Sequence, residues 1–207
     1  MGKSVLDELR LRHIPTRAVV RRPQAIDDRD GLTLVQGDVF NEASLTNALQ
    51  GSTTLISAFN PGWQEPSLYE RYLEGSWAIV RAAERASVKR VLIVGGAASL
   101  LDSNGEELLS HGVPPEPFGS GVRAARDFLH QLRDASDVTV DWAFISPPPN
   151  CGPMGPTGRT GSYRRGTDHP VVDADGVSSL SVEDLAVAIV DEALSAQAHR
   201  TRFTVGY

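Results

Sequence analysis

The sequence predicts an α/β protein with a doubly wound parallel sheet, and three observations favour this fold class. Short apolar runs of strand length alternate with longer segments whose apolar residues repeat at helical spacing. The run 91–94 is apolar throughout and precedes two glycines, which is typical of a strand buried on both faces of a parallel sheet. Strands that alternate with helices in this way require crossover connections, and these are almost always right-handed. We expect a single domain over residues 1–207.

Composition excludes several classes of partner. The chain of 207 residues is 41% hydrophobic and 22% charged, which suffices for one substantial core. A net charge of -6 without a dense Lys/Arg run argues against a nucleic-acid or membrane surface. No apolar run approaches the roughly 20 residues of a membrane helix. The single cysteine, Cys151, suits a reducing compartment, so we expect a cytoplasmic protein.

The chain opens on an expected helix rather than on a strand. Gly2 begins this helix, Val5 and Leu9 share one of its faces, and a break at 13–15 separates it from a short strand at 18–20. These are the second and third parts of a nucleotide-binding strand, loop, helix, strand unit. The first part is absent from the sequence, so we expect the sheet to lack its first strand.

The remaining elements follow from the same two periodicities. We expect further strands at 32–36, 53–58, 91–94, 138–145 and 202–205, and further helices at 44–50, 67–86, 122–132 and 185–194. Ser181 is expected to cap the last helix. Three stretches lack a clear hydrophobic periodicity. We interpret 24–31 as a polar loop, 99–118 as a surface excursion and 151–176 as a loop region over a site.

Ligands bind to open parallel sheets outside the carboxyl ends of the strands, so the residues that follow each strand are the site candidates. They are Arg21, Arg22, Gly37, Asp38, Ala58, Phe59, Asn60, Pro61, Gly95 to Ser99, and Ser146 to Pro149 with Pro147 among them.

The two arginines indicate which dinucleotide would bind. A carboxylate at this position bonds the adenosine ribose of NAD, whereas guanidinium groups at Arg21 and Arg22 suit the 2′-phosphate of NADP. The alternative is two solvated loop arginines. Asp38 has two interpretations that stay open: it accepts a hydrogen bond from the adenine amino group, or it caps the loop before Glu42.

The other strand ends have equally plain alternatives. The segment 59–62 either lines the ribose and diphosphate of the cofactor or is a simple turn after a strand. Gly95 and Gly96 either let a flat ring approach the backbone closely or form a plain turn. The sequence Gly-Lys-Ser at 2–4 lacks the preceding strand and loop of a phosphate-binding P-loop. The five histidines have no ligand spacing, so no metal site is expected.

Four segments together carry a resemblance to a known family. At 37–39, 57–62, 94–97 and 181–184 the chain resembles the atypical short-chain dehydrogenase/reductases with an NmrA-like, NAD(P)-binding Rossmann domain. Within that family, the chain most resembles the branch of the NADH-flavin reductases and flavin/biliverdin reductases. The resemblance implies a Rossmann-like fold, NADP or NAD as cofactor, and cofactor contacts at Gly2 and Val39 as well as at the strand ends.

The chain departs from the family pattern in two places. The opening strand and the Gly-x-x-Gly-x-x-Gly loop would lie before Met1, and Gly2 matches only the last glycine of that loop. None of Tyr69, Tyr72 and Tyr163 has a lysine four positions on, so the proton-donating pair of typical dehydrogenases is missing, as in the atypical branch. Ser99, His111 and Tyr163 remain candidates for polar contacts to substrate, and no catalytic residue is assigned.

We therefore expect an NAD(P)H-dependent oxidoreductase, NADP-preferring, that reduces a flavin, quinone or similar flat acceptor. One alternative is a non-catalytic NAD(P)-sensing or protein-interaction member of the family. Another is an N-terminally truncated inactive form, in which Met1 is an internal methionine of a longer working protein. The expected partner is a small-molecule acceptor, and a homodimer is left open.

Overall fold

The computed structural model describes residues 1–23 and 31–207 and confirms the α/β fold class. Most of the polar loop expected at 24–31 lies outside the described residues. The helices are α1 (Gly2–Leu11), α2 (Glu42–Leu49), α3 (Leu68–Arg85), α4 (Phe118–Asp134) and α5 (Val182–Ser195). The strands are β1 (Thr16–Val20), β2 (Leu32–Gln36), β3 (Thr54–Ser57), β4 (Arg90–Val94), β5 (Asp141–Ser146), β6 (Arg164–Gly166) and β7 (Thr201–Gly206).

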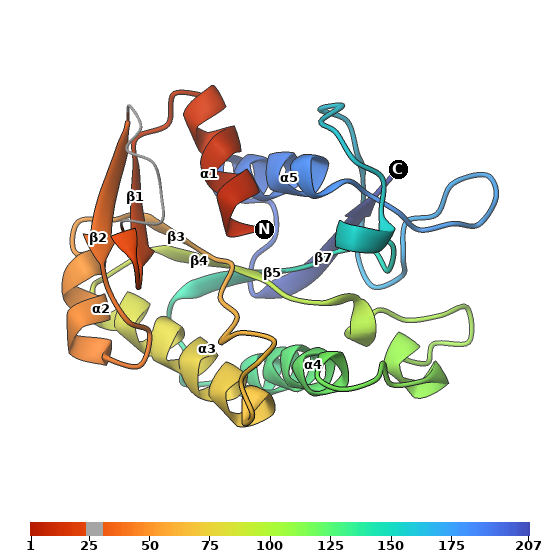
Figure 1. The fold of residues 1–207 in the computed structure, drawn as a ribbon, viewed down its shortest axis with the longest axis horizontal. Coiled ribbons are helices and arrows are strands. Elements are labelled where there is room, and N and C mark those ends of the chain that lie inside the picture. The colour runs from red at the N-terminus through yellow and green to blue at the C-terminus, as the bar shows by residue number, and fades with distance from the viewer. Residues whose placement is uncertain (24–30) are drawn as a thin grey trace.

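The strands form two sheets. The larger has the order β3-β4-β5-β7-β6, in which all pairs are parallel except β6 with β7, and β1 pairs with β2 in a separate parallel ladder. Helices cover both faces, with α1 and α5 on one and α3 and α4 on the other (Figure 1). This is the doubly wound arrangement that the alternation of strands and helices predicts.

Each face of the large sheet buries its own core. On one face Trp142 and Phe144 of β5 pack with Phe128 of α4 and with the helix α3. On the other face Leu92 and Ile145 pack with α1 and α5. The strand β4 contributes to both cores because it is central and apolar over residues 91–94, as its sequence predicts.

Within the described part of the chain, no strand joins β1 to β3, so the sheet is divided there. Figure 1 shows β1 between β2 and β3. Side chains hold the small pair in place. The Arg17 guanidinium donates to the carbonyl oxygens of Ala48 and Gln50, at 2.8 and 2.9 Å, and Val19 packs against the core on the α3 side.

Two segments expected to lack regular structure contain some. The stretch 151–176 includes β6, an Arg-Arg-Gly strand that pairs antiparallel with β7 and carries no apolar pattern. The stretch 99–118 begins at the last residue of the short 3-10 helix η2 (Ala97–Ser99) and contains a second one, η3 (Leu108–His111). The strand expected from 138 begins only at Asp141. None of the described helices is both long and apolar enough to cross a membrane.

Candidate functional site

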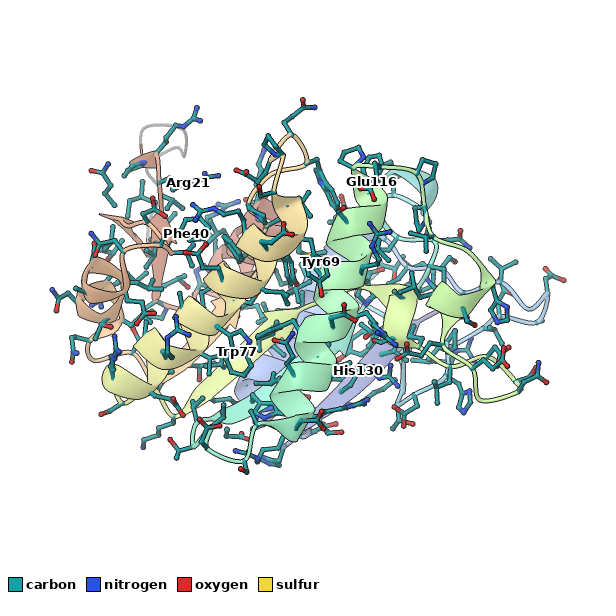
Figure 2. The ribbon with its side chains drawn as sticks, turned by 90° about the horizontal axis from the view of Figure 1, so that it is seen from below. Arg21, Phe40, Tyr69, Trp77, Glu116 and His130 are labelled. Atoms are coloured by element: carbon teal, nitrogen blue, oxygen red, sulfur yellow. The ribbon has the colours of Figure 1, made fainter. Side chains whose placement is uncertain are left out.

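The pairing register brings the carboxyl ends of the strands level with one another. Ser57 lies opposite Ile93, Val94 lies opposite Ile145, and Val20 lies opposite Gln36. The turns that follow β1 to β5 therefore share one edge of the molecule. In Figure 2, Arg21 and Glu116 lie toward this end, while Trp77 and His130 lie toward the opposite end. The sequence-predicted site residues are thus brought to a single edge.

The N-terminus of α1 lies at the same edge. A Cβ on Gly2 would lie 3.9 Å from the Cβ of Ala58, directly after β3, and Met1 packs against the core that contains Leu92 and Ile145. No side chain caps α1, and its first turn has no acidic residue. The unpaired N–H groups and the positive end of the helix dipole are the features that bind a diphosphate.

The expected adenosine end lies beyond β1 and β2. Arg21 and Arg22 are both exposed. Asp38 is exposed too, and its Oδ1 accepts from the backbone N–H of Phe40 at 3.1 Å, which accounts for the loop-capping interpretation. Only one of its oxygens is used in this bond, so the second interpretation, acceptance from an adenine amino group, is compatible with the same geometry. Val39 packs at the margin of the α3-side core.

The turn after β3 presents mostly backbone. Phe59 packs its ring on Gly75 and lies 6.0 Å from Phe40, centroid to centroid, so its side chain belongs to the core. Pro61 is buried. The Oδ1 of Asn60 accepts from the N–H of Gly62 at 2.7 Å and tightens the turn. A cofactor at this turn would therefore contact main-chain atoms and the free amide group of Asn60.

Two adjacent glycines after β4 serve different purposes. A side chain on Gly95 would overlap the buried ring of Phe144, so packing alone requires this glycine. A Cβ on Gly96 would meet only Ala125, at 3.8 Å. The open side at Gly96 is the place where a flat ring could approach the backbone. Pro147, half-buried, follows β5 at the same level.

The three candidate polar contacts to substrate differ in environment. Ser99 is buried, and Arg202 donates to its carbonyl and, at 3.3 Å, to its Oγ, while Asp168 holds the same guanidinium. His111 is exposed and lies 2.9 Å from Asp102 Oδ2. Tyr163 donates to Asp191 at 2.8 Å. Of the three, Ser99 lies nearest to the edge, at the end of the short helix η2 that comes after β4.

None of the four tyrosines is prepared to donate a proton to a substrate. The hydrogen bond to Asp127 raises the pKa of Tyr69 above its ordinary value. Burial raises the pKa of Tyr72, and burial together with the bond to Asp191 raises the pKa of Tyr163 to about 12. Tyr207 donates to Asp184 at 2.6 Å. Three of the four hydroxyls thus donate to carboxylates, and the fourth is buried.

Cys151 behaves as an ordinary thiol. Burial raises its pKa to about 11, so it is protonated at neutral pH and is a poor nucleophile.

Sequence reasoning missed an aromatic pair at this edge, formed by Trp63 after β3 and Phe118 at the start of α4. The two residues lie in segments without periodicity and far apart in the chain, so no local pattern links them. Their exposure is the signal that the structure adds.

Three features along the carboxyl edge of the sheet match the three parts of a dinucleotide. The uncapped α1 N-terminus would hold the diphosphate, Arg21 and Arg22 the adenosine phosphate, and the space beside Gly96 the nicotinamide. The residues present fit such a group along the edge of the sheet. Fold and site together define a Rossmann-type dinucleotide-binding protein.

Comparison with known proteins gives the family. A profile of the NAD(P)H-binding family matches residues 1–193, so the chain belongs to this family. It is 28% identical over 205 residues to the uncharacterized protein YwnB of Bacillus subtilis, covering 99% of this chain and 92% of that protein.

Two solved structures extend the comparison. A Bacteroides thetaiotaomicron protein, named provisionally as an epimerase, superposes with a TM-score of 0.88 at 36% identity and covers 100% of this chain and 91% of its own. A Streptococcus pneumoniae protein, named provisionally as an NADH-flavin reductase, has a TM-score of 0.82 at 26% identity and covers 99% and 93%.

Proposed function

We propose that the protein is an NAD(P)H-dependent oxidoreductase that prefers NADP and reduces a flavin, quinone or similar flat acceptor. The observation that carries the proposal is the arrangement of three features: the exposed arginine pair follows β1, the α1 N-terminus lies beside Ala58 after β3, and the open backbone at Gly96 follows β4. This order supports an extended dinucleotide with its adenosine phosphate at the arginines, its diphosphate at α1 and its nicotinamide at Gly96. Membership of the NAD(P)H-binding family supports the cofactor class, and the similarity to a protein named as an NADH-flavin reductase supports the acceptor class.

The chain contributes position rather than acid catalysis. The bound dihydronicotinamide supplies a hydride, two electrons with one proton, and the reduced acceptor takes its second proton from water. Three of the tyrosines have raised pKa values and the fourth donates to Asp184, so the protein offers no phenol for this proton. A conjugated ring spreads the charge it receives, so its orientation on the cofactor accounts for most of the acceleration.

Cofactor preference gives the decisive experiment. Arg21 and Arg22 are replaced together by alanine, and the affinities for NADPH and NADH are measured by fluorescence titration. Each charge-assisted bond to the 2′-phosphate contributes roughly 1.5–3 kcal/mol and the variant removes both arginines, so we expect NADPH binding weaker by about 100-fold or more with NADH little changed.

The matched control is Arg10→Ala, an exposed arginine in the last turn of α1, at the opposite end of that helix. It should leave both affinities unchanged. Equal loss of NADPH and NADH in the double variant would contradict the NADP preference. Wild-type protein that does not oxidise NADPH with riboflavin or menadione would contradict the reductase assignment.

A second candidate is a non-catalytic NAD(P)H sensor. The engagement of Tyr69, Tyr163 and Tyr207 as donors to carboxylates favours it, because none is available as a catalytic acid. This candidate predicts measurable NADPH affinity without turnover across flavin and quinone acceptors, and the oxidation assay separates the two.

A further inference from the structure

An exposed aromatic pair lies beside the proposed cofactor edge. Trp63 is 44% exposed and Phe118 is 52% exposed, although both are large and apolar. Their ring centroids lie 5.0 Å apart at an interplanar angle of 48°. Val113, a third exposed apolar residue, comes from the same loop that leads into α4. Apolar side chains that gather on a surface in this way mark binding sites.

Trp63 lines an open cavity between the N-termini of α3 and α4, and the ring of Phe118 packs against Trp63. Its volume is about 460 Å³, within the range of small-molecule sites. Both helices begin at the carboxyl edge of the sheet, so the cavity adjoins the edge that the cofactor would follow. It is lined by Trp63, Gln64, Glu65, Pro66, Leu68, Glu116, Pro117 and Ser120.

The indole of Trp63 is held in position by a glycine. A Cβ on Gly121, in the first turn of α4, would lie 2.7 Å from Cζ3 of Trp63 and 3.0 Å from Cδ2 of Leu68. The missing side chain therefore lets the indole rest against the helix. A ring that is seated before a ligand arrives loses little conformational entropy on binding.

The charges around the cavity are acidic. Among the residues that the structure describes, its lining includes Glu65 and Glu116 and no lysine or arginine. Glu116 accepts from Ser120 N at 3.0 Å and from Arg123 at 2.6 Å, and these bonds hold the pKa of its carboxyl below the ordinary value. Arg123 balances one of the two carboxylates, which leaves an excess of negative charge. This negative charge opposes the attraction that the N-termini of α3 and α4 would exert on a phosphate.

We propose that the Trp63–Phe118 cavity binds the acceptor, and that it selects planar rings without an anionic group, such as riboflavin or a quinone, over phosphorylated flavins such as FMN. Stacking on the Trp63 ring, which Phe118 supports from the side, provides affinity, and Glu65 with Glu116 provides the selection against phosphate. This inference rests on the proposed function for the source of the hydride, but binding at the cavity can be measured without NADPH.

The first experiment measures binding in the absence of cofactor. Riboflavin fluorescence is quenched when its ring stacks on indole, so titration of riboflavin with the full chain gives an affinity. Trp63→Leu with Phe118→Leu should weaken it by about 10-fold, in line with the loss of aromatic stacking. Gly121→Ala, which displaces the indole and keeps both aromatic residues, should weaken it several-fold.

Leu194→Ala is the matched control, because Leu194 is an exposed apolar residue, at 62%, and lies in α5 rather than in the lining of the cavity. It should leave riboflavin affinity unchanged. Riboflavin affinity that is the same in the wild type, the double variant and Gly121→Ala would overturn the assignment of the cavity.

The second experiment tests the selection by charge. Wild-type protein should bind riboflavin about 3- to 10-fold more tightly than FMN, and Glu65→Gln with Glu116→Gln should reduce that ratio toward one. A ratio of one in the wild type would overturn the selection. The titrations contain no NADPH, so a protein that binds riboflavin here and fails to bind NADPH would refute the proposed function and leave this site standing.

Discussion

At the scale of single residues, the two glycines after β4 show that adjacent identical residues can be required for unrelated reasons. Gly95 lies against Phe144, which is fully buried between sheet and helices, whereas Gly96 has only Ala125 near it. A ligand-based argument applies to Gly96 alone. Gly95 is a cofactor candidate by position, but its lack of a side chain is explained by packing.

This difference predicts opposite effects on stability. Gly95→Ala forces a methyl group into the Phe144 ring, which cannot move without disturbing the core, so we expect a loss of roughly 1–3 kcal/mol or more in the free energy of unfolding. Gly96 has an extended backbone, with φ of -135°, and Gly96→Ala should be neutral or slightly stabilising. Urea unfolding of both variants checks this. Equal destabilisation by the two would contradict the packing argument.

At the scale of elements, the divided sheet separates a well-buried unit from a poorly buried one. The strands β4 and β5 are flanked on both sides and almost entirely buried. Among the described strands, β1 and β2 pair only with each other, and they are mostly half-buried or exposed. Two paired strands alone are marginally stable in water, so the small pair depends on Arg17 and on its packing against the α3 side.

Amide hydrogen exchange should resolve the two units. We expect the amides of β1 and β2 to exchange at least about 10-fold faster than those of β4 and β5, because opening the small pair exposes little apolar surface. Arg17→Ala, which removes the bonds to Ala48 and Gln50, should accelerate exchange in β1 further and leave β4 unchanged. Uniform protection across all four strands would show instead that the two sheets open as one unit.

At the scale of the whole molecule, the order of elements was predictable because it depends on periodicity. Continuous apolar sequence identified β4, and Ser181 caps α5 as expected, accepting from Asp184 N at 3.0 Å. The strand β6 was not predictable, because an Arg-Arg-Gly sequence is a strand only through pairing with β7.

The site was predictable to the same degree. The strand-end rule located the edge, yet it could not show that the Phe59 ring turns into the core or that Trp63 meets Phe118. Both depend on contacts between residues far apart in the sequence.

Acid sensitivity is also a property of the whole chain, because one carboxylate joins three distant segments. Asp184 in the first turn of α5 accepts from Thr160 N, Gly161 N and the Tyr207 hydroxyl, at 2.6 to 3.1 Å. Burial alone would raise the pKa of Asp184, but these hydrogen bonds outweigh it and hold the pKa below its ordinary value. The native state therefore favours the carboxylate more than the unfolded chain does.

The sign of the pH effect follows from that shift. The contribution of Asp184 is fully present above the unfolded-state pKa of about 4 and is lost as pH falls through the lower native value. Asp184→Asn presents an amide to the same donors, so we expect a loss of roughly 1–3 kcal/mol at pH 7 and a flatter decline of stability below about pH 4. Asp137→Asn, at an exposed aspartate, should change neither. Urea unfolding at several pH values measures both effects.

The contradicting outcome is a decline of stability below pH 4 that is as steep in Asp184→Asn as in the wild type. It would assign the acid sensitivity to other carboxylates. Glu8 and Asp168, whose pKa values are also lowered, are the first to examine.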